Sequence, residues 1–538
     1  MTRESDLGRR SAEIWKFFRS TPCNKATVSQ FLHDADSEKE QYNAEINKFK
    51  FAIYMLEKKR DTLEKTAKLF KSLLAPIYTL PSEILTIIFA FACEENVLSR
   101  SKLPEAARLS MVCGRWRDLA HTTPSLWSNI SIDFQSWKQH FSILNRLTEL
   151  FMERSAKSPL QIHLSLPDDG FSEDRSEKDE AYSVLRPVVA NCQRWRCVSF
   201  STISSSIADV LSPVRGRLPL LTSLGFDCKG ASASSIPFPL FDNCPALHTL
   251  HITSAIPRPF QTEAPPFPWR QITSLRLATL YNISAFPVLS LCPSVEHLEL
   301  YEVGGTNDES QDYSDHVVSS DIRSLTITSA LDQSDVDGVF QHTTLKGLSS
   351  LKICGGMWSM SEQTTWLEWN ETRLHDFLQR SSCTITSLHL KNLPITDDQT
   401  LSLLRMMPGI SSLCIEELRN EGENRIVTKT LLDGLDVKGP LAFPASAPLV
   451  PRLAELKLVV HAKDLHSDPF MKALLCRWLS DPNEARELGV DCLRSVVIVA
   501  ILGPDQEGGL LDSLLELRDA GMRLVITYGK VSELYPHD

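Results

Sequence analysis

The side chains that could carry acid–base or metal chemistry in this chain of 538 residues are scattered rather than grouped. Neighbouring carboxylates can divide the roles of acid and base, and such pairs in turn-rich segments include Glu94/Glu95, Asp168/Asp169 and Asp397/Asp398. In loops, charges of this kind are usually solvated. The 14 histidines do not cluster and the 13 cysteines show no Cys-x-x-Cys spacing, so we expect no metal site.

None of the common catalytic motifs is present. The chain lacks Gly-x-Gly-x-x-Gly and Gly-x-x-x-x-Gly-Lys-Ser/Thr for nucleotide phosphates, His-Glu-x-x-His for zinc, and Gly-x-Ser-x-Gly for a nucleophilic serine. We therefore predict no catalytic residues and no cofactor. An enzyme is the least favoured of the functions considered for this chain.

Six polar residues stand inside a repeated apolar pattern and are candidates for contacting another protein: His251, Arg276, Glu299, Lys352, His389 and Lys457. Each lies between two apolar residues, as in a strand whose alternate side chains face opposite ways. If the apolar residues face the core, these six face outward. Their mixed charges suit a target protein, and the alternative is that they are only solvated.

The elements that must position these residues come from the same pattern, apolar-x-x-apolar-x-apolar, which recurs along residues 191–530. It occurs eleven times, with these middle residues: Val198, Leu224, Leu250, Leu275, Leu298, Leu325, Leu351, Leu388, Leu413, Leu456 and Val496. Six of the ten intervals are 25 to 27 residues long, and Ser or Thr precedes the middle residue in eight units. This period predicts short strands that stack into one continuous core, and an ordinary α/β domain with similar strands stays the alternative.

A second organised stretch runs from residue 77 to residue 130. Pro81 suits the first turn of a helix, and the pattern places four apolar residues on one face of that helix: Ile84, Leu85, Ile88 and Phe89. A second stripe at spacings of three and four follows: Leu109, Val112, Cys113, Trp116, Leu119 and Ala120. Pro124 should end that helix, which lets Leu126 and Trp127 fold back against it.

In order, this stretch reads Leu80-Pro81, Glu83-Ile84-Leu85, Ile88-Phe89, Val112-Cys113-x-x-Trp116-Arg117 and Pro124-x-Leu126-Trp127, and it resembles the F-box. The resemblance implies a three-helix module over residues 76–134 that docks on the Skp adaptor of a cullin–RING ubiquitin ligase. It implies these adaptor contacts: Leu80, Pro81, Ile84, Leu85, Ile88, Phe89, Trp116, Leu126 and Trp127. Val112 and Leu119 are expected in the core. The long spacer at residues 93–105 departs from the family's pattern, and the alternative is a small helical bundle with no docking role.

Residues 38–75 are predicted to form one long amphipathic helix. Apolar residues follow alternating steps of four and three, with Arg60 and Ala67 as weaker positions of the seam: Tyr42, Ile46, Phe49, Ile53, Leu56, Leu63, Phe70 and Leu74. The helix either dimerises the protein as a coiled coil or folds onto its own chain. A long helix that ends just before an F-box resembles the arrangement in many F-box proteins of mushroom-forming fungi.

The expected fold is α/β, with the long helix and F-box-like module followed by an irregular solenoid. Residues 191–530 resemble the irregular leucine-rich repeats, arranged as a horseshoe, that often follow an F-box. The predicted segments are 1–36, irregular; 37–75, helix or coiled coil; 76–134, F-box-like; 135–190, a connecting helix and strand; and 191–530, repeats. Residues 167–180 are acidic and are expected to form an exposed loop.

Composition and net charge argue against some classes of partner and location for this protein. A net charge of −11 and a pI near 5.8 argue against nucleic acid, and no apolar run reaches the roughly 20 residues that span a membrane. The N-terminus resembles no signal peptide, so we expect reduced thiols and a cytoplasmic or nuclear location.

Two functions follow from these patterns. In the first, the chain is the substrate-recognition subunit of a Skp–cullin–F-box ligase and directs a target protein to ubiquitin-dependent degradation. In the second, it is a repeat scaffold without a ligase role, with residues 38–75 as a candidate dimer contact. The sequence identifies neither the target nor the exact number of repeats.

Overall fold

The computed structural model describes these residues: 15–16, 25–72, 74–166, 175–201, 207–227, 236–253, 264–278, 286–303, 317–319, 321–329, 333–355, 371–393, 395–417, 426–437, 448–462, 467–479, 482–503, 509, 511 and 514–530. They belong to two compact units, Met1–Leu85 and Thr86–Asp538. The expected α/β fold with a long N-terminal helix is confirmed. No helix among the described residues is both long and apolar enough to cross a membrane.

The first unit consists mainly of helix α2 (Lys25–Ser72), with 48 residues and neither Gly nor Pro in its length. The helix begins at Lys25, whereas the sequence pattern placed its start near residue 38 and left the preceding residues irregular. Residue Ala75 has extended backbone angles (φ −63°, ψ 136°), as expected for a residue before proline, and the 3₁₀ helix η1 (Pro76–Thr79) follows. Helix α3 (Ser82–Ala92) then continues into the second unit.

The second unit is built on one parallel sheet of fifteen strands, which lie in chain order except that β9 and β11 pair separately. The sheet strands are β1 (Asn96–Leu98), β2 (Asn129–Asp133), β3 (Leu160–Ser165), β4 (Trp195–Ser201), β5 (Ser223–Asp227), β6 (Thr249–Thr253), β7 (Ser274–Ala278), β8 (His297–Val303), β10 (Ser324–Ser329), β12 (Ser350–Cys354), β13 (Ser387–Lys391), β14 (Ser412–Glu416), β15 (Glu455–His461), β16 (Ser495–Ile501) and β17 (Arg523–Gly529). The separate pair is β9 (Val317–Ser319) and β11 (Thr343–Leu345).

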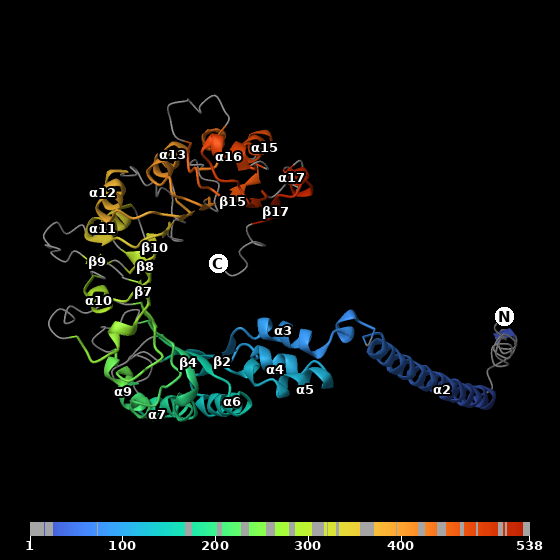
Figure 1. Cartoon of the computed structure of the whole chain (residues 1–538). Helices are drawn as coiled ribbons and strands as arrows, with labels where there is room; N and C mark the ends of the chain where they lie inside the picture. The colour runs from blue at the N-terminus through green and yellow to red at the C-terminus, as the bar shows by residue number, and fades with distance from the viewer. Residues whose placement is uncertain are drawn as a thin grey trace. The chain divides into compact units, whose positions relative to one another are not determined.

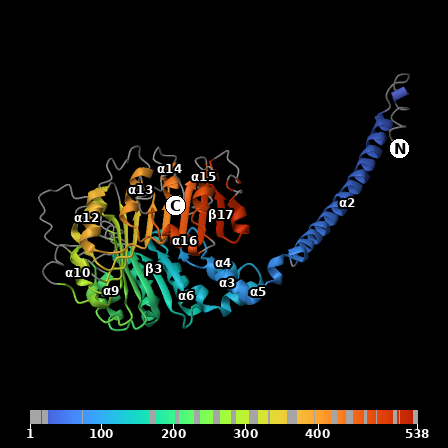
Figure 2. The same cartoon turned by 45° about the horizontal axis from the view of Figure 1, so that its top comes forward.

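Helices connect these strands, as parallel pairing requires. They are α4 (Glu105–Ser110), α5 (Gly114–Thr122), α6 (Phe141–Arg154), α7 (Arg175–Ser183), α8 (Leu185–Ala190), α9 (Ile207–Leu211), α10 (Phe286–Leu291), α11 (Gln333–His342), α12 (Glu371–Ser381), α13 (Asp397–Met406), α14 (Lys429–Leu435), α15 (Ser467–Leu475), α16 (Pro482–Leu488) and α17 (Leu515–Asp519). Within this unit the sheet is curved and the helices lie on its outer side (Figure 1). Figure 2 shows the strands side by side along the inner face.

The core of the sheet is made by the eleven apolar units that the sequence predicts. Each unit coincides with one strand from β4 to β16, and none of its apolar residues is more than 4% exposed. Neighbouring units pair in register, so that Leu250 faces Leu275 and Leu325 faces Leu351. One strand's apolar residues thus lie beside those of the next, and stacking buries a face that a single unit would leave in water.

Main-chain hydrogen bonds repeat at the start of the sheet strands from β6 to β16. The carbonyl of His248 accepts from the N–H groups of Thr273 (2.9 Å) and Ser274 (3.0 Å). The carbonyl of Arg323 accepts in the same way from Ser349 (3.0 Å) and Ser350 (2.9 Å). The Ser/Thr residues that precede the middle apolar residue begin their strands at equivalent positions of this ladder.

Two connecting segments differ from the sequence-based expectation. The first is the acidic stretch at residues 167–180, whose C-terminal part belongs to helix α7, while residues 167–174 lie outside the described part of the chain. The second is the spacer at residues 93–105, which contributes β1 to the sheet, paired in parallel with β2. The sheet therefore runs across the boundaries expected near residues 134 and 190.

Candidate functional site

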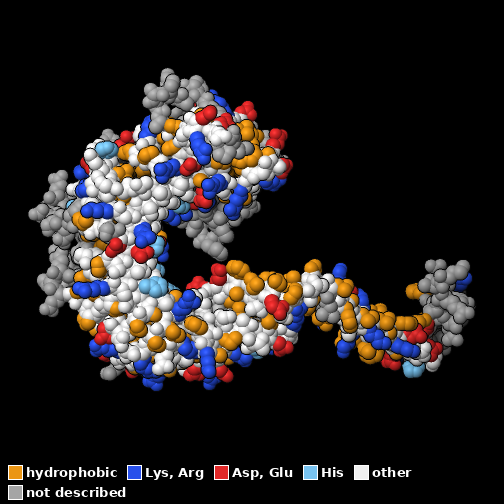
Figure 3. Space-filling model, in the orientation of Figure 1, with side chains coloured by type: hydrophobic (Ala, Val, Ile, Leu, Met, Phe, Trp, Pro, Cys, Tyr) orange, Lys and Arg blue, Asp and Glu red, His pale blue; other side chains and the backbone are white. Residues whose placement is uncertain are grey.

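Helix α3 is apolar on both faces, and only one face is covered. Leu85 and Phe89 are buried, at 0% and 1% exposure. Four other apolar side chains, spaced by three, one and three residues, are exposed to 44%, 53%, 42% and 70%: Ile84, Ile87, Ile88 and Phe91. This spacing puts the four on one side of a helix. We call this set the outer face of α3, and hydrophobic side chains are visible along it in Figure 3.

The structure corrects the sequence-based placement of four predicted adaptor contacts. The pattern put Ile84, Leu85, Ile88 and Phe89 on one face, but the exposed pair and the buried pair lie about 100° apart around the helix. Leu126 and Trp127, also predicted as contacts, are 1% and 2% exposed. These buried side chains hold the module together and cannot meet a partner in this conformation. Of the other predicted contacts, Pro81 is exposed, while Leu80 and Trp116 are half-buried.

The turn between α4 and α5 adds two more exposed apolar residues, Met111 (66%) and Val112 (57%). Val112 was expected in the core. The reason for the difference is that α4 ends at Ser110 and α5 begins at Gly114, so Val112 lies in a turn rather than on a helical stripe. Cys113 caps α5, its Sγ accepting from the N–H of Trp116 at 3.5 Å. The indole of Trp116 packs 4.8 Å from the ring of Phe89, which joins α5 to α3.

Two buried polar groups fix the module to the sheet. Asn96, at 0% exposure, donates to the carbonyls of Leu126 and Asn129 and accepts from the N–H of Ala106, each at 2.9 Å. One side chain on β1 thus ties together β2, α4 and the turn that ends the module. The indole N–H of Trp127 donates to the carbonyl of Ala120 at 2.7 Å. Unpaired, such buried groups would each cost about 1–3 kcal/mol, so this arrangement is specific as well as stable.

The six polar residues predicted to face outward do form a row across the open face of the sheet. His251 is paired with Arg276, and Arg276 with Glu299, in neighbouring strands. Lys352 is paired with His389 in the same register. Lys457 lies beyond them on β15 and is exposed, whereas the other five are half-buried. Two groups of side-chain contacts lie within this row, one in its N-terminal half and one in its C-terminal half.

The first group is centred on Arg276. Its Nε lies 3.0 Å from Glu299 Oε2, and its guanidinium carbon lies 4.3 Å from the ring centre of Tyr301. Arg276 also donates to the Tyr301 hydroxyl. Burial lowers the pKa of His251, and the positive charge of Arg276 next to it acts in the same direction. This half of the face is therefore held in one arrangement by an ion pair stacked on an aromatic ring.

The second group is centred on Glu416, whose side chain is only 9% exposed. The ammonium groups of Lys457 and Lys391 lie 3.1 Å and 3.7 Å from its carboxylate, and His389 Nε2 lies 3.3 Å away without hydrogen-bond alignment. Burial by itself would raise the pKa of Glu416, but the neighbouring His389 and Lys457 outweigh it and lower the pKa to about 2. The carboxylate is therefore ionised and surrounded by positive charge.

The same neighbourhood contains the nearest approach to a metal-binding set among the described residues. Ligand atoms of His389, Cys414 and Glu416 lie within 4.8 Å of one another. The pKa of the Cys414 thiol is raised to about 11, chiefly by burial, so the thiol stays protonated and is a poor ligand. Two lysines already neutralise Glu416. We assign this cluster to ion pairing, not to metal binding.

Comparison with known proteins adds one positive finding. Residues 77–133 match the F-box-like family. The match begins just before α3 and ends with β2, so it covers the exposed apolar residues described above. It confirms the F-box-like module expected from the sequence, and F-box-like domains generally bind Skp-type adaptors in ubiquitin ligase complexes. No curated protein matches the chain.

Proposed function

We propose that this protein is the substrate-recognition subunit of a Skp–cullin–F-box type ubiquitin ligase. The observation that carries the proposal is the outer face of α3, which exposes Ile and Phe side chains inside the segment that matches the F-box-like family. Covering such a side chain is favourable by about 1.5–3 kcal/mol. A Skp-type adaptor seated on this face accounts for the exposure.

The test is a binding assay between the purified chain and a purified Skp-type adaptor. Ile88→Asp and Phe91→Asp should each weaken binding by at least about tenfold, because each removes an apolar contact and buries a charge. Both residues face water, so the melting temperature should stay close to that of the wild type. A charge at Leu85 would be a poor test, because that side chain is buried and the change would destabilise the fold.

Ile143→Asp is the matched control. Ile143 lies on α6 and is exposed to 55%, close to the exposure of Ile87, but it is not on α3. This variant should bind the adaptor like the wild type. Adaptor binding that survives both α3 substitutions would contradict the proposed docking face.

We propose further that β4 to β16 are units of an irregular leucine-rich-repeat horseshoe, and that its open face holds a target protein. The buried apolar units in register and the polar row from His251 to Lys457 support this assignment. The cullin scaffold is reached through the adaptor, and ubiquitin transfer takes place on other subunits. This chain contributes proximity, raising the effective concentration of target lysines near the ubiquitin carrier.

On this proposal the chain itself is not an enzyme. It works in the cytoplasm or the nucleus, where the cysteines of proteins are kept reduced. The resemblance to F-box proteins of mushroom-forming fungi stays a prediction from the sequence. The second candidate, a repeat scaffold without a ligase role, rests on the long exposed helix α2. It would be favoured if the full chain bound no Skp-type adaptor under conditions in which it is folded.

A further inference from the structure

Helix α2 exposes large apolar side chains along much of its length. Between residues 42 and 70 these include Tyr42, Ile46, Phe49, Ile53, Leu56, Leu63 and Phe70, which are 48% to 70% exposed. They recur at alternating steps of four and three residues, the spacing of a coiled-coil seam. A continuous stripe of this kind in water marks a surface that binds another protein chain.

The residue types along the stripe favour a particular partner geometry. In heptad terms, positions a of the helix are Ile46, Ile53, Arg60 and Ala67, and positions d are Tyr42, Phe49, Leu56, Leu63 and Phe70. β-Branched Ile at position a combined with Leu at position d favours a parallel coiled coil of two helices. The central part of the seam, from Ile53 to Leu63, has this composition.

Charges beside the seam agree with a parallel, in-register pair of identical helices. In that arrangement each g residue faces the e residue of the next heptad on the other chain. Glu45 then faces Lys50, and Lys59 faces Glu64. The remaining g–e pairs between residues 38 and 71 each contain at least one uncharged residue, so no like charges meet at these flanking positions.

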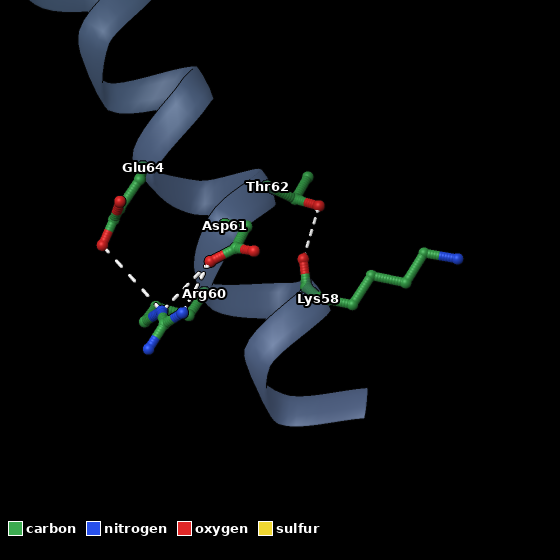
Figure 4. Close-up of polar contacts among 5 residues, drawn as sticks. All are labelled: Lys58, Arg60, Asp61, Thr62 and Glu64. Atoms are coloured by element: carbon green, nitrogen blue, oxygen red, sulfur yellow. Dashed lines mark hydrogen bonds and ion pairs between the residues drawn. The ribbon is translucent and has the colours of Figure 1, made fainter. Parts of the chain in front are cut away.

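Arg60 is the charged residue within this part of the seam. On its own helix it pairs with Asp61 at 2.9 Å and with Glu64 at 4.0 Å, and its side chain is 64% exposed (Figure 4). A single polar residue at an a position lowers the stability of a coiled coil but fixes its register and number of strands. Arg60 therefore acts against shifted or higher-order assemblies.

We infer that α2 pairs with α2 of a second copy of this chain in a parallel, in-register, two-stranded coiled coil. A second copy of α2 accounts for both the apolar stripe and its flanking charges. When two identical helices pair in register, their apolar residues meet along the seam and their flanking charges meet charges of opposite sign. The inference goes beyond adaptor docking and is independent of it. Parallel pairing would place two F-box-like modules after the same end of one coiled coil.

The test uses two phenylalanines of the full-length chain that are equally exposed but lie on opposite sides of α2. Phe49 (65%) is in the seam, and Phe51 (66%) lies two residues away, about 200° around the helix. The wild type should sediment at twice the chain mass of 60.4 kDa and dissociate on dilution. Phe49→Asp should raise the dimer dissociation constant at least about a hundredfold, since each dimer loses two buried Phe contacts. Phe51→Asp should change it little.

A monomer at every concentration would overturn the inference, as would equal effects of the two substitutions. Circular dichroism of both variants shows whether α2 stays helical. The dimer can fail while Ile88→Asp still abolishes adaptor binding, and the reverse can also occur, so the two proposals are tested separately.

The register is tested by disulfide cross-linking. Leu56→Cys and Leu63→Cys are each made in the full chain, oxidised and analysed by mass spectrometry for the peptide linked to itself. Both should cross-link, because equivalent d positions meet in a parallel in-register pair. An antiparallel pair brings at most one of them face to face, so a self-link at only one position contradicts the parallel register. Lys65→Cys, which points away from the seam, is the control and should not cross-link.

Discussion

Glu416 shows how a single buried charge can set the properties of the open sheet face. Its carboxylate lies next to Lys457, Lys391 and His389, and its pKa is lowered to about 2 from an ordinary value of 4.5. A group whose pKa is lower in the folded than in the unfolded protein stabilises the fold above its unfolded pKa, and this contribution is lost as the pH falls through the folded value.

Glu416→Gln should therefore lower the free energy of unfolding by about 2–3 kcal/mol at pH 7. The difference from the wild type should shrink as the pH falls below about 4.5 and vanish near 2. Urea denaturation at several pH values measures it. Glu299→Gln is the control on the same face, and because its ion pair with Arg276 is about two-fifths exposed, it should cost less than about 1 kcal/mol. A Glu416 effect that did not depend on pH would contradict the assigned ion pairing.

At the scale of elements, the molecule presents two surfaces of different chemistry. The outer face of α3 is apolar and suits an adaptor that buries it, whereas the row across the open sheet face is polar and mostly basic in its C-terminal half. Lys352, Lys391 and Lys457 outnumber Glu416 there, although the chain as a whole carries a net charge of −11. A protein partner with an acidic segment would be attracted to this half of the sheet.

Lys352→Glu combined with Lys457→Glu should weaken target binding several-fold or more without affecting adaptor binding. The measurement is quantitative affinity purification of the variant and the wild type, scored for proteins that are lost while the Skp-type adaptor is retained. Lys157→Glu, an exposed lysine in the turn after α6, is the control and should lose none of them. If the double variant keeps every protein that the wild type binds, the target does not occupy this part of the sheet.

At the scale of the whole molecule, the F-box-like module shares one parallel sheet with the strands that follow it. Strand β2 of the module pairs with β3, and the indole of Trp127 packs 5.0 Å from the ring of Phe151 on α6. The module therefore completes its core with residues that follow it in the chain. In a stacked sheet each strand is stabilised mainly by the strands next to it. A terminal strand whose neighbour is removed therefore loses the contacts that bury its apolar residues.

A chain that ends at residue 134 should consequently fail to unfold cooperatively, because β2 loses its partner strand and Trp127 loses its cover. A chain that ends at residue 303, after β8, keeps both contacts and should still fold and bind the adaptor. Thermal unfolding followed by circular dichroism distinguishes the two. Cooperative unfolding of the shorter chain would show that the module is an independent domain.

Periodic features could be predicted from the sequence because they depend on neighbours along the chain. Three such features are the steps of four and three along α2, the Leu80-Pro81 motif at the start of α3 and the eleven apolar units. Each is defined by residue type and spacing along the chain, which the sequence contains directly. The polar residues between them alternate by strand geometry, so the outward row from His251 to Lys457 followed as well.

Which side of an apolar element is covered was decided only by the tertiary structure. Helix α3 carries large apolar side chains on two adjacent faces, so its sequence does not distinguish Phe89, which packs on Trp116, from Ile88, which stays exposed. The exposed apolar residues Ile87 and Phe91 of α3 were missed for the same reason. The contribution of β1 to the sheet was equally hidden, because its position depends on Asn96 bonding to residues about 30 positions away. Burial depends on which other residues pack against a side chain. Those residues are distant in the sequence and come together only in the folded structure.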